Sequence, residues 1–221
     1  MTNQVHVIPS EVEESRCDSL KIVPRDPSTS LSMTGLVAAF TIIELLVVIT
    51  IIIVLAGLIL ATTGYVQKKG ARSRAETEIA AMSAALESYK ADNGAYPRDT
   101  ANLTTENLDP RTSGDPSNYR TASRFLYDEL FGSKNGSRTP ATGKKSYFIF
   151  KPNMLGPIDQ SQNVQYIRDP FGNSYGYSTA YQHDIDGGAN PPTHGYNPTF
   201  DLWSTGGVTA GTDQSQWIKN W

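Results

Sequence analysis

The chain has 221 residues, and its 19 Lys and Arg against 22 Asp and Glu give a formal net charge of −3. This length suits one domain of ordinary size with extensions, and the near-neutral charge excludes a typical nucleic-acid-binding protein, which needs a strongly basic face. The single cysteine, Cys17, excludes a disulfide framework and a cysteine-based metal site.

The first part of the chain has no hydrophobic period. Residues 7–32 are rich in Ser, Pro and acidic side chains, which is typical of a disordered segment. We interpret residues 1–32 as a mis-assigned start and expect translation to begin at Met33. The alternative is a genuine but disordered cytoplasmic leader.

A long apolar run follows. From Leu45 to Ala61 every residue is apolar or Gly except Thr50, and the flanking residues extend the run to residues 42–63. About 20 such residues are needed to span a bilayer as a helix. A secretory signal peptide would have a shorter apolar core and a cleavage site behind it. The pattern therefore predicts a membrane-spanning helix over residues 40–63.

One carboxylate lies inside this run. Glu44 comes two residues after the apolar stretch begins, and no Lys or Arg lies within a helical turn or two of it. Because a carboxylate in lipid is costly, it normally has a partner. We expect the partner of Glu44 to come from elsewhere than the local sequence.

The residues around Glu44 match a known motif. The sequence Ala-Phe-Thr-Ile-Ile-Glu-Leu-Leu-Val-Val of residues 39–48 closely resembles the prepilin cleavage and methylation motif of type IV pilins and type II secretion pseudopilins. The resemblance implies that a prepilin peptidase removes residues 1–39 by cutting between Ala39 and Phe40, and then N-methylates Phe40. It also implies that Glu44 pairs with the Phe40 amine of a neighbouring subunit and so sets axial register. The family usually has Gly where this chain has Ala39.

The helical pattern continues beyond the apolar run. Residues 64–93 are amphipathic, with one apolar stripe at helical spacing: Ala75, Ile79, Met82, Leu86 and Tyr89. Glu78 and three other charged residues lie off the stripe. Asn93-Gly94 predicts the end of the helix, because Gly accepts the left-handed turn there, and Pro97 prevents the helix from resuming.

Residues 85–97 resemble the end of the long helix in major pseudopilins. The resemblance implies an α+β type IV pilin fold, in which one long N-terminal helix packs on a small antiparallel sheet. Residues 94–221 would form a β-rich globular domain, with a polar segment at about 98–145 that we interpret as an insertion. Within it, residues 123–130 predict a short helix.

The strands are predicted in the second half of the domain. Candidate strands are residues 147–151, 165–167, 175–178 and 200–204. The sequence Asp-Pro-Phe-Gly-Asn-Ser-Tyr of residues 169–175 predicts a turn and resembles the turn of the pseudopilin sheet. Residues 181–188 predict a solvated loop.

A calcium site is implied by the same resemblance. Major pseudopilins hold Ca²⁺ in the loop after the last strand, which here is residues 204–217. That loop offers Asp213 and Ser204, and Asp201 is the nearest further carboxylate. Ca²⁺ usually takes more than one carboxylate, so the calcium site is either degraded in this chain or completed by a distant group such as Asp201. We expect no other cofactor.

The resemblance implies a structural subunit of a type II secretion pseudopilus rather than an enzyme, since no nucleophile–His–acid set stands out. Its expected partners are copies of itself, minor pseudopilins, the prepilin peptidase, the inner-membrane assembly platform and, before assembly, membrane lipid. We expect a single-pass inner-membrane protein with a periplasmic C-terminal domain, although bases such as Lys68 and Lys69 follow the span where the positive-inside rule disfavours them. The alternatives are a type IV pilin or minor pilin for adhesion, motility or DNA uptake, and a membrane-anchored enzyme.

Overall fold

The computed structural model describes residues 40–221, so the expected leader and Ala39 lie outside the described residues. The chain divides into two units, Met1–Thr50 and Ile51–Trp221. The helices are α1 (Ile42–Asn93), η1 (Pro116–Tyr119), α2 (Arg120–Phe131), η2 (Pro152–Met154) and α3 (Ala180–Asp186). The strands are β1 (Leu155–Gly156), β2 (Tyr166–Ile167), β3 (Gly176–Ser178), β4 (Asp201–Ser204) and β5 (Ile218–Lys219).

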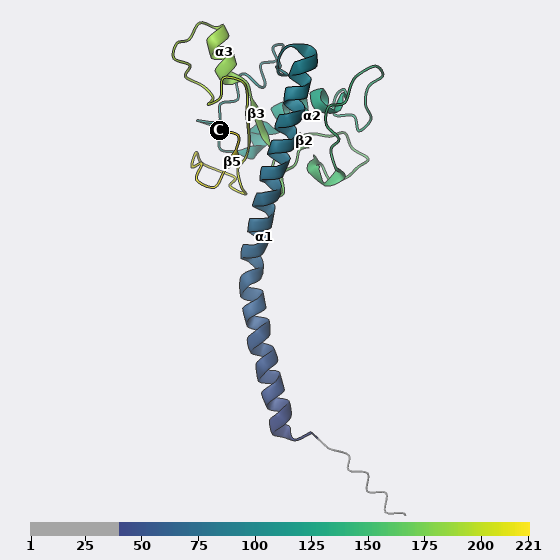
Figure 1. Cartoon of the computed structure of the whole chain (residues 1–221), viewed down its shortest axis with the longest axis vertical. Helices are drawn as coiled ribbons and strands as arrows, with labels where there is room; N and C mark the ends of the chain where they lie inside the picture. Colours follow the sequence, from purple (N-terminus) through teal and green to yellow (C-terminus); the bar gives the residue numbers. More distant parts are fainter. Residues whose placement is uncertain (1–39) are drawn as a thin grey trace, which may run out of the picture. The chain divides into compact units, whose positions relative to one another are not determined.

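The C-terminal half of α1 packs into the globular unit and contributes to its hydrophobic core. Figure 1 shows α2, α3 and the strands gathered around it. Its buried face consists mainly of the predicted stripe, with Ala75, Ile79, Met82 and Leu86 all buried. The helix ends at Asn93, where Gly94 takes a φ of +81° and donates its N–H to the Lys90 carbonyl over 2.7 Å. The predicted helix end is therefore confirmed.

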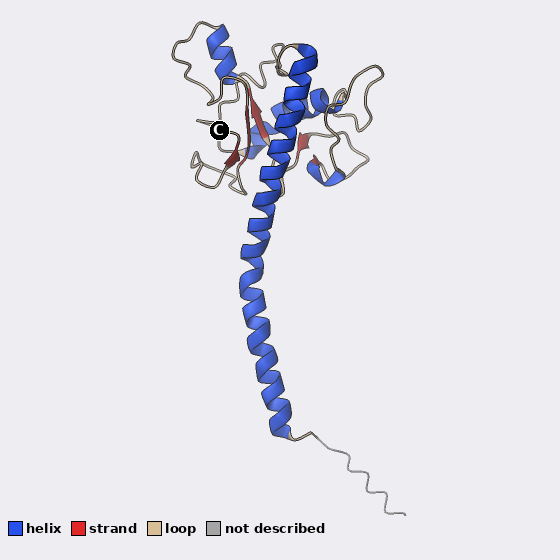
Figure 2. Cartoon of the chain, in the orientation of Figure 1, coloured by secondary structure: helices blue, strands red, loops and turns tan. Residues whose placement is uncertain are grey.

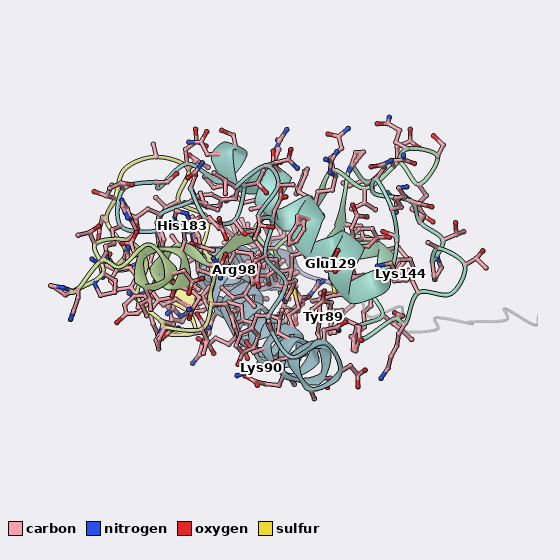
Figure 3. All side chains as sticks on the ribbon, turned by 90° about the horizontal axis from the view of Figure 1, so that it is seen from above. Tyr89, Lys90, Arg98, Glu129, Lys144 and His183 are labelled. Carbon is pink, nitrogen blue, oxygen red and sulfur yellow. The ribbon has the colours of Figure 1, made fainter. Side chains whose placement is uncertain are left out.

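Helix α2 crosses the core beside α1. It buries Ala122, Leu126, Tyr127 and Leu130, and Gly132 ends it in the left-handed conformation with a φ of +73°. Figure 3 labels Tyr89 of α1 and Glu129 of α2, whose phenol and carboxylate lie 2.6 Å apart. The segment we expected to be a polar insertion thus contributes a core helix, because its apolar residues recur at helical spacing.

The strands form two small antiparallel sheets. One pairs β1 with β2, and the other has the order β3-β4-β5. In the second sheet Gly176 lies opposite Trp203, and a Cβ atom on Gly176 would lie 2.1 Å from the indole ring. Glycine at this position therefore lets a fully buried tryptophan fit between the strands. Figure 2 shows how short the strands are compared with the loops.

Two sequence predictions of secondary structure are wrong. Residues 147–151 form no strand, because the N–H groups of Tyr147 and Phe148 both bond to the carbonyl of Leu130 at the end of α2. Residues 181–186, part of the expected loop at 181–188, belong to helix α3. The short strands β1 and β5 were not anticipated either, since two residues give no readable period.

Candidate functional site: the exposed apolar start of the long helix

The N-terminal part of α1 makes no buried contact. Every residue from Phe40 to Gly70 is exposed, and α1 is the one helix in the described residues that is long and apolar enough to cross a membrane. Water would penalise so large an apolar surface. This surface therefore requires lipid or other protein around it.

The helix begins with a reciprocal cap between Thr41 and Glu44. Glu44 Oε2 accepts hydrogen bonds from the backbone N–H and the hydroxyl of Thr41, both over 2.9 Å. The backbone N–H of Glu44 in turn donates to Thr41 Oγ1 over 3.3 Å. This arrangement is a capping box, in which two side chains satisfy the free N–H groups of the first helical turn. It also places a negative charge at the positive end of the helix dipole.

Thr41 is a local partner of Glu44, contrary to our expectation that the partner would come from elsewhere. The spacing Thr-x-x-Glu just before an apolar run is itself the signal of a capping box, but only Lys and Arg were considered as partners of Glu44. Both bonds from Thr41 end on Oε2, and Oε1 accepts none from the described residues. The second oxygen of Glu44 is therefore available to a group outside this part of the chain.

Phe40 lies beside the cap with 82% of its surface exposed. The predicted cleavage bond joins it to Ala39, which is outside the described residues, so cleavage and methylation stay predictions. The prediction that Glu44 sets register between subunits needs Phe40 of a second copy, and it stays a prediction too.

The three expected calcium ligands each bind a different partner. Ser204 Oγ lies 2.5 Å from Asp169 Oδ2, whereas the two oxygens of Asp201 accept the backbone N–H groups of Tyr196 and Asn197 over 2.8 and 2.9 Å. Asp213 is exposed and binds the N–H and hydroxyl of Ser215.

The electrostatics of these acids differ accordingly. Burial raises the pKa of Asp201 to about 6, against the lowering effect of its two backbone hydrogen bonds. The pKa of Asp213 is lowered by its bonds to Ser215. Residues 40–221 contain no group of three or more His, Cys, Asp or Glu side chains that could hold a metal ion. In this arrangement the donors do not fit Ca²⁺, which takes six to eight oxygen ligands.

The turn at residues 169–175 is held by hydrogen bonds to its first residue, Asp169. Asp169 Oδ1 accepts the N–H groups of Phe171 and Asn173, and Oδ2 binds the Ser204 hydroxyl at the end of β4. Burial raises the pKa of Asp169, and these hydrogen bonds oppose the rise. The predicted turn is confirmed, and the Asp169 carboxylate also connects it to the end of β4.

A polar trio joins α1 to the sheet side of the domain, and two of its members, Glu78 and Tyr175, are buried while Arg74 is exposed. Glu78 Oε2 accepts the Tyr175 hydroxyl over 2.8 Å, and Oε1 lies 2.7 Å from Arg74 Nε. Burial, followed by the Glu78 charge, raises the pKa of Tyr175 far above its usual range. Helical spacing places Glu78 off the apolar stripe, and its burial was not predicted because its partner Tyr175 is 97 residues away in the sequence.

His194 lies beside an acid and a hydroxyl but does not form a catalytic set with them. His194 Nδ1 lies 2.9 Å from Asp184 Oδ1 and 3.2 Å from Thr193 Oγ1. A hydroxyl nucleophile and an orienting acid must contact opposite ring nitrogens for the imidazole to relay a proton, and here both contact the same one. The bond to His194 also lowers the pKa of Asp184. We therefore interpret this cluster as a set of hydrogen bonds that holds the loop in place.

Comparison with known proteins gives a consistent picture. Residues 64–132 match the family "Type II secretion system (T2SS), protein G". The chain is 28% identical over 155 residues to the type II secretion system core protein G of Dickeya chrysanthemi, an alignment that covers 69% of this chain and 95% of that protein.

Two further relatives with the same description align over shorter stretches. The protein of Pectobacterium carotovorum subsp. carotovorum is 35% identical over 80 residues, 36% of this chain and 51% of its own length. That of Vibrio cholerae serotype O1 is 35% identical over 81 residues, 37% of this chain and 55% of its own length. No solved structure matches the chain significantly. The family match extends through α2, so it includes much of the segment that we expected to be an insertion.

Proposed function

Because the chain is a type IV pilin-like protein of the type II secretion protein G kind, the major pseudopilin class, we propose that it polymerises through the apolar start of α1 into a pseudopilus. The observation that supports this proposal is the uncovered apolar surface of residues 42–63, which contains one capped carboxylate, Glu44. A membrane shields this surface in the free subunit, and neighbouring copies of α1 shield it in the filament.

The chemistry at Glu44 supports ordered assembly. Oε2 is held by Thr41, while Oε1 accepts no bond from the described residues. A new amine at Phe40 of an adjacent copy would supply the missing positive partner. In a low-dielectric surrounding an unpaired carboxylate is heavily penalised, so only the axial register that forms this pair is favourable.

The finer parts of the proposal concern processing and partners. A prepilin peptidase cuts between Ala39 and Phe40 and methylates Phe40, and an inner-membrane assembly platform then adds the subunit beneath minor pseudopilins. The globular domain lies in the periplasm, and the filament moves exported proteins without catalysing a reaction.

A complementation experiment tests this function. In a strain lacking the gene, the wild-type chain should restore secretion of exported enzymes, and mass spectrometry should find a mature chain that begins with methylated Phe40. Glu44→Gln keeps an acceptor for Thr41 but removes the charge, so it should insert in the membrane, be processed, and fail to form filaments.

Three outcomes would contradict the proposal. Secretion that persists without the gene would refute the role in export, and lost motility or adhesion would then favour the pilin alternative. A mature chain that retains Ala39 would refute the cleavage site. Normal filaments from Glu44→Gln would refute the register role of the carboxylate.

A further inference from the structure

A basic groove lies next to the end of the apolar run. It has a volume of about 770 Å³ and lies between α1 and the loop that follows β4. Tyr65, Lys68, Lys69 and Arg72 line it from α1 at spacings of three, four and seven residues, which is one face of a helix. Phe171 and the 206–208 turn line the other side.

The wall of the groove is held in place by specific contacts. Arg72 donates to the carbonyls of Gln216 and Trp217 over 3.0 and 3.4 Å. Gly206 takes a φ of +65°, and a Cβ atom there would lie 2.2 Å from the Gln216 carbonyl oxygen. The close approach of the backbone at Gly206 to that at Gln216 therefore depends on glycine. The groove is thus shaped by specific contacts of the fold.

The two lysines of the groove have no acidic partner. Lys68 and Lys69 are exposed, and neither forms an ion pair or a hydrogen bond through its ammonium group within residues 40–221. Arg72, by contrast, donates to the Gln216 carbonyl and pairs with Glu76, whose Oε1 lies 3.3 Å from Arg72 Nε. No carboxylate lines the groove, so it presents two unsatisfied positive charges beside two aromatic rings.

The position of the groove along α1 indicates the occupant. The apolar run ends at Thr63, and Tyr65 follows it as tyrosines do at the membrane–water interface. Lys68 lies five residues beyond Thr63, about 7.5 Å along a helix axis. The headgroup layer on each side of a bilayer is about 5 to 8 Å thick. The lysines therefore lie at the depth of lipid phosphates when residues 42–63 span the membrane.

We propose that the groove lined by Lys68, Lys69 and Tyr65 binds the phosphate of an anionic phospholipid headgroup. The two ammonium groups bind the phosphate oxygens as compact charges, and the Tyr65 and Phe171 rings contact the glycerol and upper acyl region. The site gives these bases a role on the face of the membrane where the positive-inside rule does not predict them. The inference rests on the membrane anchoring proposed above but not on filament formation.

The test uses the full chain reconstituted in phosphatidylcholine vesicles. Trace spin-labelled phosphatidylglycerol or phosphatidylcholine is added, so that the bilayer has no bulk surface charge, and the motionally restricted fraction of each label is measured by electron paramagnetic resonance. We expect the wild type to restrict phosphatidylglycerol preferentially. Lys68→Gln/Lys69→Gln should weaken that preference by about fivefold for each lysine removed.

The matched control is Lys134→Gln/Lys144→Gln, which removes two exposed lysines of the globular unit, one of them labelled in Figure 3. It should leave the preference unchanged. Equal restriction of both labels by the wild type, or full displacement by inorganic phosphate, would overturn the lipid assignment. If the wild type restricts both lipid labels equally and Lys68→Gln/Lys69→Gln loses chemical crosslinks between subunits, the groove is a contact between copies of the chain instead.

Vesicle flotation separates this inference from the anchoring on which it rests. The wild type and both double variants should float with neutral vesicles, because the apolar run is intact in all three. A wild type that does not float would refute the anchor itself. Flotation without headgroup preference would refute the groove alone.

Discussion

Thr41 and Glu44 cap the start of α1 reciprocally, with the Glu44 carboxylate accepting two bonds from Thr41 and the Thr41 hydroxyl accepting one in return. The cap supplies local hydrogen bonds to a carboxylate that enters the membrane with the helix. It also leaves one oxygen available, so the same residue can start the helix and later meet a neighbouring amine.

Thr41→Val should loosen the first turn of α1 while leaving the charge in place. Loss of an N-cap side chain typically costs about 1 kcal/mol, so the amide hydrogens of residues 42–45 should exchange several-fold faster in detergent micelles. Thr50→Val is the control, since the Thr50 hydroxyl bonds to the Leu46 carbonyl within the helix. Equal exchange rates in the wild type and Thr41→Val would contradict the cap.

Tyr175→Phe should destabilise the globular unit. It removes the hydroxyl that donates to Glu78 Oε2 over 2.8 Å and leaves a buried carboxylate oxygen unsatisfied, which costs about 1 to 3 kcal/mol. Chemical unfolding of the full chain in micelles measures the change. Tyr181→Phe, at a hydroxyl with no hydrogen bond in residues 40–221, should change the free energy of unfolding by no more than a few tenths of a kcal/mol.

The buried carboxyl of Asp201 should make stability fall as pH rises. Its native pKa of about 6 lies above the ordinary value of about 3.9. Between these two values the native state holds a proton that the unfolded chain releases, so the free energy of unfolding decreases through this range. The full effect is about 2 to 3 kcal/mol.

Comparison with Asp201→Asn isolates this contribution. The wild type should lose stability relative to the variant between pH 4 and pH 7. Asp213→Asn is the control, because the pKa of Asp213 is lowered and any contribution from it is lost as pH falls instead. A wild-type advantage over Asp201→Asn that grows with pH would show that the carboxyl ionises readily in the folded state.

Removal of calcium should leave the thermal midpoint unchanged. Ser204, Asp201 and Asp213 each satisfy a different partner, so no oxygen set is prepared for the ion. If the loop bound Ca²⁺, a free Ca²⁺ concentration of about one hundred times the dissociation constant would raise the free energy of unfolding by about 2.7 kcal/mol. This gain would raise the thermal midpoint of a domain of this size by several degrees. A fall of that size on adding EGTA would show that the loop rearranges around Ca²⁺.

Features that repeat or end locally could be predicted from the amino-acid sequence alone. The apolar run predicted the membrane helix, the stripe through Ile79 and Met82 predicted its buried face, and Asn93-Gly94 predicted its end. Each of these rests on period or on a single residue's backbone preference, so neighbouring residues suffice to indicate it. The motif at residues 39–48 indicated the family for the same reason.

Which polar groups meet depends on the packing of the folded chain. Glu78 lies off the apolar stripe yet is buried against Tyr175, and Ser204 binds Asp169 rather than joining Asp213. The groove beside Lys68 is bordered by the loop around Gln216, whose carbonyl accepts a hydrogen bond from Arg72. These contacts join residues 35 to 144 positions apart, and hydrogen bonds of that range depend on the packed core that brings the segments together, not on any local pattern.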